Sequence, residues 1–371
     1  MKKSLIALAL MGAFSGAAFA QSNVTMYGIL DVNYTWQEQP TVVGTGTAAR
    51  VQQESVSMIG GSHQSGNRWG VRGTEALGGG LNAIFAIEAG FSIDTGTSSQ
   101  GGRLFGRQAY AGLSGGWGSV VAGRLATFSS GTGDFDMIGR VDPFLTGFGL
   151  ANAGNTFISM NSLRVDNAIA YVSPKFAGFQ GGVGYTTRID GQEVTPSGNN
   201  VSAFISGINW SAGPFFAAAT YDVVNNISGA PDQKHLQIGG TWDIASFRLH
   251  AAWADQSNIA AVPVGATAGT FIVLPTGLQN FDANSWLLGA TWTATSAIKV
   301  FGSYQVFDAK GKTVGTVNFE PDFNIWSLGA TYNLSRRTNL YTSYASRNAD
   351  GTLLENSANA KQLAIGIRHL F

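Results

Sequence analysis

The sequence contains no cysteine, so no disulfide framework can hold the folded chain together. Charged residues are also scarce: they make up 12% of the chain, against about 25% in ordinary soluble domains. Neither sign dominates, because 22 Lys and Arg residues face 22 Asp and Glu residues. Without a basic excess, nucleic acid is not an expected partner.

Long hydrophobic runs are missing from most of the chain. After residue 20 no segment approaches about 18 consecutive apolar residues, so we expect no membrane-spanning helix. The apolar run from Leu5 to Phe14 follows Lys2 and Lys3 and is succeeded by small residues up to Ala20. This pattern is typical of a cleaved secretory signal. We therefore expect residues 1–20 to be removed and residues 21–371 to form a single domain.

Glycine and aromatic residues are abundant instead. The chain has 50 Gly, where the usual ~7% would give about 26. Alternating apolar and polar residues between turn signals indicate short strands. The pattern predicts sixteen of them, at 24–35, 65–75, 80–92, 104–114, 118–124, 163–173, 178–187, 200–210, 214–223, 234–243, 246–256, 283–293, 297–307, 323–333, 338–347 and 361–371.

The connections between these strands alternate in length. Those after the even-numbered strands are short, as at 76–79, 115–117 and 211–213, whereas those after the odd-numbered strands are long, as at 36–64, 125–162 and 257–282. Such alternation places all long loops at one end, and it is typical of a transmembrane barrel with short periplasmic turns and long extracellular loops. The fold class we expect is all-β, a sixteen-stranded antiparallel transmembrane barrel, which leaves no sheet edge unpaired in lipid.

The two faces of the strands support this expectation. In 283–293, Trp286, Leu288 and Trp292 share one face, and the residues between them are mostly small or polar, as a water-filled interior would allow. Leu287 and Phe301 are exceptions, since both are large and apolar on the predicted inner face. Four aromatic residues beside short turns predict a girdle at the periplasmic rim: they are Trp210, Trp242, Trp292 and Tyr332.

The last strand also alternates, and the sequence closes on Phe371. This ending, together with several internal segments, resembles the general porins of Gram-negative bacteria, especially their β-proteobacterial branch. The segments are Val24-Thr-Met-Tyr-Gly-Ile-Leu-Asp31, Arg68-Trp-Gly-Val-Arg-Gly-Thr-Glu-Ala-Leu-Gly-Gly-Gly-Leu81, Leu104-Phe-Gly-Arg-Gln-Ala-Tyr-Ala-Gly-Leu113, Gly118-Ser-Val-Val-Ala-Gly-Arg124, Asp142-Pro-Phe144 and Ile367-Arg-His-Leu-Phe371.

The resemblance implies a homotrimer in the outer membrane, in which each barrel has its own pore for passive diffusion of small hydrophilic solutes and ions. It implies outer-membrane lipid, lipopolysaccharide and the barrel assembly machinery as partners, the last reading Phe371 as its signal. Two positions depart from the family pattern. Leu370 stands where a basic residue is common, and Asp142-Pro-Phe replaces the enteric Pro-Glu-Phe-Gly.

The same resemblance implies which residues line the pore. The third long loop, about 125–162, would fold inward and offer Asp134, Asp136 and Asp142 towards a wall of arginines. Arg68, Arg107 and Arg124 match the family's wall, and strand parity adds Arg72 and Arg164. Glu88 is a further candidate for the inner face. Five cations against three loop carboxylates predict a weak anion preference.

Catalytic, cofactor and metal sites are not expected. Gly112-Leu-Ser114-Gly-Gly116 fits the nucleophile-elbow spacing, but that motif needs a strand-to-helix turn, and a hairpin is predicted here. The histidines at 63, 235, 250 and 369 lack metal-ligand spacing. The alternatives that stay open are a substrate-specific channel of the same fold, an outer-membrane lipase or protease, and a soluble β-sandwich adhesin.

Overall fold

The computed structural model describes residues 23–43, 50–157, 164–225, 231–259, 261–263, 271–273, 281–310, 312–314, 317–319, 322–350 and 359–371. The predicted secretory signal at 1–20 and residues 158–162 of the predicted third loop lie outside these ranges. Among the described residues, no helix is long and apolar enough to cross a membrane.

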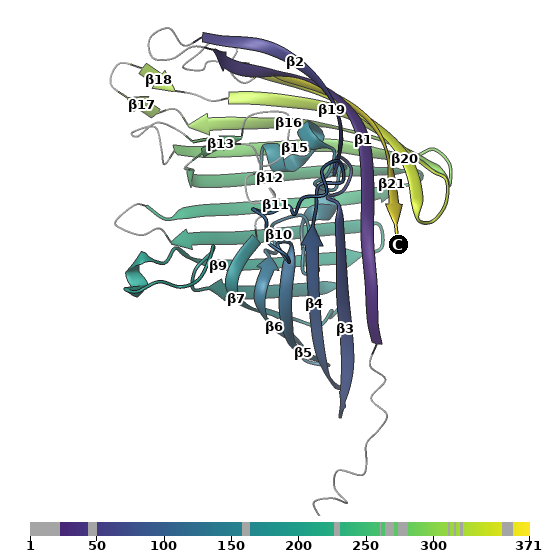
Figure 1. Cartoon of the computed structure of the whole chain (residues 1–371), viewed down its shortest axis with the longest axis vertical. Coiled ribbons are helices and arrows are strands. Elements are labelled where there is room, and N and C mark those ends of the chain that lie inside the picture. Colours follow the sequence, from purple (N-terminus) through teal and green to yellow (C-terminus); the bar gives the residue numbers. More distant parts are fainter. Residues whose placement is uncertain are drawn as a thin grey trace, which may run out of the picture.

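Sixteen antiparallel strands form a closed barrel (Figure 1), as the sequence predicts. Each barrel strand pairs with the next one along the chain, across long loops as well as short turns, as sequential strands commonly do. In barrel order they are β1 (Asn23–Val43), β3 (Arg68–Gly78), β4 (Leu81–Gly90), β5 (Gln108–Gly115), β6 (Gly118–Ala126), β7 (Arg164–Val172), β8 (Phe179–Thr186), β9 (Ser202–Ala212), β10 (Phe215–Asn225), β11 (Gln233–Ile244), β12 (Phe247–Ile259), β15 (Phe281–Thr293), β16 (Ile298–Lys310), β19 (Asp322–Asn333), β20 (Thr338–Asp350) and β21 (Ala360–Leu370).

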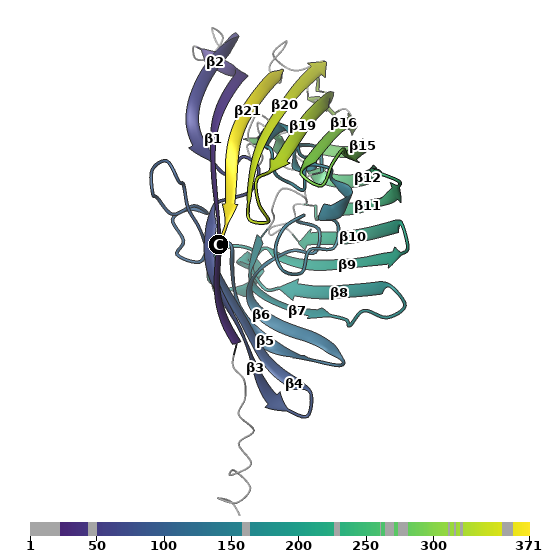
Figure 2. The same ribbon diagram turned by 90° about the vertical axis from the view of Figure 1, so that its right-hand side faces the viewer.

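The barrel closes where β21 pairs with β1, from Ile29 opposite Leu370 to Glu38 opposite Lys361. The other edge of β1 pairs with β3, from Asn23 to Ile29. Phe371 continues the ladder past the last strand: its N–H donates to the carbonyl of Gly28 and its carbonyl accepts from the Gly28 N–H, at 3.1 and 3.0 Å. Figure 2 shows β1 lying beside β21 at this seam, with the carboxyl terminus against β1.

An additional strand corrects the predicted loop at 36–64. β1 continues to Val43, and β2 (Arg50–Gly61) pairs with its upper half, from Val32 opposite Gly61 to Val43 opposite Arg50. Most of the described β2 side chains are exposed on both faces. A strand that is exposed on both faces buries no apolar face, so the alternation pattern does not detect it. Two short hairpins, β13 (Ala261–Pro263) with β14 (Phe271–Val273) and β17 (Lys312–Val314) with β18 (Val317–Phe319), also lie within predicted loops.

The outer face of the barrel is apolar, as predicted. Trp286, Leu288 and Trp292 are exposed on β15, whereas Ser285 and Leu287, which alternate with them, are buried. At the short-turn rim the predicted tryptophans each contact an aromatic ring of the paired strand, with ring centroids about 6 Å apart. The three pairs are Phe179 with Trp210, Phe215 with Trp242 and Phe247 with Trp292. Amphipathic rings at this height favour the headgroup layer of a bilayer.

Candidate functional site: the barrel interior

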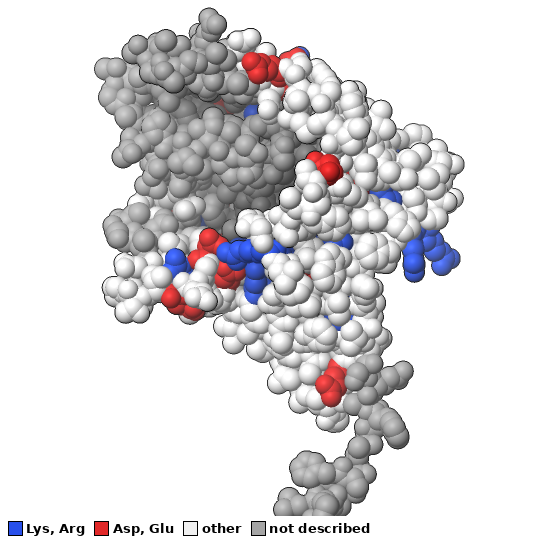
Figure 3. All heavy atoms as spheres, viewed as in Figure 1, with Lys and Arg blue, Asp and Glu red and all other residues white. Residues whose placement is uncertain are grey.

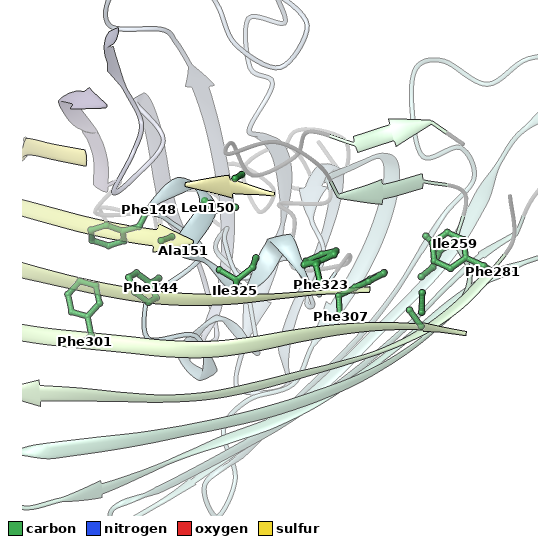
Figure 4. Packing of buried hydrophobic residues seen from close by; sticks show 14 of the residues in the cluster. Phe144, Phe148, Leu150, Ala151, Ile259, Phe281, Phe301, Phe307, Phe323 and Ile325 are labelled. Atoms are coloured by element: carbon green, nitrogen blue, oxygen red, sulfur yellow. The ribbon is translucent and has the colours of Figure 1, made fainter. Parts of the chain in front are cut away.

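The segment between β6 and β7 folds into the barrel and carries three short 3-10 helices, η2 (Gly139–Val141), η3 (Gly149–Ala151) and η4 (Ala153–Asn155). Its Phe144 and Phe148 are buried and contact Phe301 of β16 edge to face, at centroid distances of 5.0 and 5.2 Å. Figure 4 shows these rings together with Leu150 and Ala151 beside the inner faces of the strands. The apolar exception Phe301 is therefore part of the surface that holds the loop.

Leu287, the other exception, has the same explanation. It is 1% exposed and belongs to a buried cluster with Ile138, Val141 and Phe157 of the loop. Burying apolar side chains stabilises this contact by roughly 25 cal/mol per Å² removed from water. At this wall the inner face is a packed interface, which explains the two apolar exceptions to the polar inner face.

Inward glycines make room for the loop. A Cβ atom added at any of five such positions would lie 2.6 to 3.1 Å from a loop side chain, closer than carbon atoms normally approach. The positions and their loop neighbours are Gly182 (Phe128, Met137), Gly207 (Met137, Phe128), Gly239 (Val141), Gly289 (Pro143) and Gly329 (Phe144). The small inner residues along β8 to β19 therefore serve close packing of the loop.

Polar side chains of the wall bind the loop backbone. Gln305 donates from Nε2 to the Ala151 carbonyl at 2.8 Å, and Gln362 accepts from the Leu150 N–H at 2.8 Å. Gln256 and Ser285 both donate to the Thr156 carbonyl, at 3.0 and 2.6 Å. These bonds satisfy backbone groups that would be costly to bury unpaired. The loop is thus fixed along β12 to β21 by both apolar and polar contacts.

Asp142 occupies the centre of the loop and not its pore face, which corrects the sequence prediction. Its side chain is 0% exposed and accepts from the N–H groups of Phe144, Thr146 and Ala153 at 2.9, 3.0 and 2.9 Å. Burial raises the pKa of Asp142 to about 6, and the three N–H donors oppose that rise. At pH 7 the carboxylate is ionised and joins two separate turns of the loop.

The other two predicted loop carboxylates differ from each other. Asp136 accepts from the N–H groups of Ile138 and Gly139 at 3.3 and 2.9 Å, and burial raises its pKa to about 6. It therefore shapes the turn before η2. Asp134 is exposed, and one of its oxygens accepts from the Tyr110 hydroxyl at 2.7 Å. Of the three, Asp134 is exposed, Asp136 is partly exposed and Asp142 is buried.

The predicted arginines gather on the opposite wall around Glu88 of β4. Arg107 donates from Nε to Glu88 at 2.6 Å, and Arg68 lies 3.9 Å from the same oxygen. Arg164 donates from Nε to the Arg107 carbonyl at 3.0 Å. All three guanidinium groups are mostly buried. Among the described contacts, Glu88 is the carboxylate that pairs with Arg68 and Arg107.

A second part of the cluster forms around Asp166 of β7. Arg124 donates to one Asp166 oxygen at 2.5 Å, and Arg103 donates to the other at 2.7 Å. Arg103 also pairs with Asp190, which is largely exposed. Within the part of the chain that the structure describes, five arginines (68, 103, 107, 124 and 164) thus gather around three carboxylates (88, 166 and 190), so arginines outnumber carboxylates on this wall. We call these five residues the arginine cluster. Figure 3 shows blue Lys and Arg atoms bordered by red Asp and Glu atoms in the middle of this face.

Arg72 lies apart from the arginine cluster, further along β3. Its side chain is exposed, and the guanidinium carbon lies 5.1 Å from the centroid of the Tyr27 ring. The Tyr27 hydroxyl in turn donates to Glu88 at 3.0 Å. The exposed guanidinium of Arg72 adds a further positive charge to this wall.

Sequence reasoning missed Arg103 and the roles of the two central carboxylates, Glu88 and Asp166. The signal for Asp166 was its place two residues after Arg164, on the same strand face. Arg103 lies in the loop before β5 (Figure 1), where parity gives no information. No local pattern could have brought it to Asp166, which is 63 residues away in the chain.

The serine and two of the histidines that were considered as catalytic or metal-binding candidates lie in strands of the barrel. Ser114 lies on β5 opposite Ser119, next to the hairpin that leads into β6. His250 contacts the Val141 carbonyl and the Thr291 hydroxyl, both at 3.1 Å, so it faces inward and touches the loop. His369 contacts the Thr338 hydroxyl at 2.9 Å near the short-turn rim. Among the described residues, no group of three or more His, Asp or Glu side chains is arranged to hold a metal ion.

Comparisons with known proteins agree with this geometry. The family model described as Gram-negative porin matches residues 6–352. An outer membrane porin protein of Bordetella pertussis is 36% identical over 338 residues, which cover 84% of this chain and 86% of that protein. Outer membrane porin protein 32 of Delftia acidovorans is 31% identical, over 84% of this chain and 81% of its own length.

Solved structures share the fold. An anion-selective porin from Comamonas acidovorans superimposes with a TM-score of 0.72 at 23% identity, covering 95% of this chain and 100% of that one. The outer membrane protein OmpT of Vibrio cholerae, in a trimer form, gives a TM-score of 0.62 at 14% identity, covering 94% of this chain and 99% of the other.

Proposed function

Because this chain belongs to the Gram-negative porin family, we propose that its channel prefers anions weakly and that the preference arises at the arginine cluster. Porins are outer-membrane channel proteins, so the chain forms a water-filled path for passive diffusion of small hydrophilic solutes and ions. The observation that carries the proposed preference is the excess of arginine over carboxylate on the wall formed by β3 to β7.

The proposed constriction lies between the third loop, about 125–162, and this wall. Arg68, Arg72, Arg107, Arg124 and Arg164 provide the basic side, and Asp134 is the loop carboxylate that faces solvent. Fixed charges beside a narrow aqueous path are only partly screened at physiological salt, where the Debye length is about 8 Å. A chloride or carboxylate ion passing the wall is therefore stabilised relative to a cation. The Comamonas acidovorans structure described as anion-selective supports the same sign by analogy.

Neutralising Arg72 or Arg107 is expected to shift selectivity towards cations. Arg72→Gln removes an exposed charge that lies against the Tyr27 ring, so the barrel is expected to fold normally. After Arg107→Gln, the arginine that remains beside Glu88 is Arg68, whose Nη1 lies 3.9 Å from Glu88 Oε1. This variant is therefore expected to shift the selectivity more than Arg72→Gln does and to lose some stability. The measurement is the zero-current potential of each purified variant in a planar bilayer with a KCl gradient.

Arg336→Gln is the matched control, because Arg336 lies exposed in the short turn between β19 and β20, away from the wall. Equal potentials for wild type and for both wall variants would remove the arginine wall from the selectivity mechanism.

We also propose the assembly state and processing of the chain. Three copies would associate, as the Vibrio cholerae trimer form suggests by analogy, after removal of residues 1–20 as a secretory signal from a barrel domain of residues 21–371. Phe371 would serve as the signal read by the barrel assembly machinery, and lipopolysaccharide would contact the long loops. Crosslinking of the protein in native outer membranes tests the trimer, since a monomer band alone would contradict it.

A further inference from the structure

A second group of charged side chains lies inside the barrel, away from the arginine cluster. Arg248 of β12 donates to Asp243 of β11 through two bonds, Nε to Oδ1 at 2.5 Å and Nη2 to Oδ2 at 2.9 Å. Arg140 of the loop helix η2 approaches the same carboxylate, with Nη2 at 3.3 Å from Oδ2. All three side chains are more than a third exposed, so they are in contact with water.

This group is near the short-turn end of the barrel. Asp243 and Arg248 are directly opposed in the β11–β12 ladder, and the turn at Ala245 and Ser246 joins these strands. The arginine cluster lies at the other end: Arg107 precedes β5, Arg124 is near the end of β6, and Arg164 begins β7. A solute that crosses the barrel therefore passes the two groups one after the other.

The charges in this second group do not balance. Arg248 occupies both oxygens of Asp243, so Arg140 is the surplus cation. Its guanidinium carbon lies 4.9 Å from the centroid of the Phe216 ring, which helps to fix its position. Burial and the neighbouring Arg248 lower the pKa of Arg140, while Asp243 opposes that effect. Lys299 of β16 shares the inward parity of buried Phe301 and is exposed near the same rim.

We infer that Arg140 and Arg248, held by Asp243, form a second binding station for small anions at the periplasmic side of the loop, suited to carboxylates and inorganic phosphate. A half-exposed guanidinium offers paired N–H donors that match the oxygens of these anions. Conduction through a pore is favoured when several weak sites share the path, because each binds firmly enough to admit an ion and weakly enough to release it. This inference rests on the proposed anion preference and adds a second location to it.

Because the sequence contains no cysteine, one introduced thiol can report the electrostatic potential beside Arg140 and Arg248. Thr293→Cys would introduce a single thiol on β15, two residues beyond Thr291, which is paired with Arg248. Such a diagonal neighbour lies about 7 Å away. The ratio of its reaction rates with a negatively and a positively charged methanethiosulfonate reagent reports the sign of the nearby field.

A unit charge about 7 Å from the thiol changes each rate about 2.5-fold in water, in opposite directions for the two reagents. Arg140 contacts Asp243, which pairs with Arg248, so Arg140→Gln in the Thr293→Cys background is expected to lower the ratio, by up to roughly sixfold at low salt. Asp243→Asn is expected to raise it by a similar factor, so the test does not depend on one variant folding. The matched control Arg336→Gln is expected to leave the ratio unchanged, because that residue lies in the turn outside the group.

Inorganic phosphate supplies the binding readout. Millimolar phosphate is expected to reduce the chloride current of the wild-type channel, with a weaker effect on Arg140→Gln and a stronger effect on Asp243→Asn. If the wild type prefers anions, but Arg140→Gln and Asp243→Asn leave thiol reactivity in the Thr293→Cys background and phosphate sensitivity unchanged, the second station is wrong and the proposed preference stands. If the wild type shows no anion preference and Arg107→Gln changes nothing, the proposed preference itself fails.

Discussion

Gly28→Val is expected to prevent the barrel from closing. Gly28 lies on the outer face of β1, and the Phe371 ring covers it: an added Cβ would lie 2.2 Å from Phe371 Cζ and 2.8 Å from the Arg68 carbonyl oxygen. The ring could rotate away, but the carbonyl belongs to the backbone of β3 and cannot move without breaking the β1–β3 ladder. Because β1 also pairs with β21, one substitution disturbs both edges of the strand at the seam.

The measurement is the fraction of folded barrel after refolding into detergent, followed by the heat-dependent shift in electrophoretic mobility. Met26→Val is the matched control, since Met26 is 64% exposed on the same face of the same strand. Phe371→Ala tests the ring separately from the backbone. It removes the aromatic ring that covers Gly28 and keeps the two backbone hydrogen bonds between residues 28 and 371. We expect a smaller loss for Phe371→Ala than for Gly28→Val. Equal folding of Gly28→Val and Met26→Val would show that the seam tolerates a side chain there.

Asp142→Ala is expected to release the third loop from the inner wall while leaving the barrel folded. Three N–H groups would lose their acceptor, two of them in buried bonds and that of Thr146 in a part-buried one. Each buried unsatisfied donor costs about 1–3 kcal/mol, so the loop would lose at least about 2 kcal/mol of local stability. Strand pairing does not depend on this carboxylate, so the folded fraction is expected to stay close to that of the wild type.

Single-channel recording measures the result. Release of the loop from Phe301 and Gln305 is expected to give a larger and noisier conductance. Arg336→Gln is the control, because Arg336 lies exposed in the short turn between β19 and β20 and away from the third loop. A quiet wild-type conductance in Asp142→Ala would contradict the central position that we assign to this carboxylate.

The barrel was predictable because its determinants are local. Alternation along a strand and the length of the next connection are both readable within about ten residues, and they placed all sixteen barrel strands. Strand β2 was not predictable in this way, because its described side chains are mostly exposed on both faces. The glycines along the inner wall could be located, but their purpose depends on a loop that contacts them across the interior.

The candidate site was only partly predictable, because some of its contacts join residues that are far apart in the sequence. Parity and family resemblance placed Arg68, Arg107 and Arg164 on one wall, where the structure brings them together around Glu88. The same reasoning could not distinguish the exposed Asp134 from the buried Asp142. Whether a loop carboxylate faces water or its own backbone depends on how the loop turns, and no strand period governs that choice.

The zero-current potential of the wild-type channel in a planar lipid bilayer, under a KCl gradient, tests the central claim most directly. An arginine wall that outweighs its carboxylates predicts that chloride crosses more readily than potassium, so the dilute side becomes negative relative to the concentrated side. A positive dilute side would mean that cations cross more readily, and it would contradict a net positive wall along the path through the barrel.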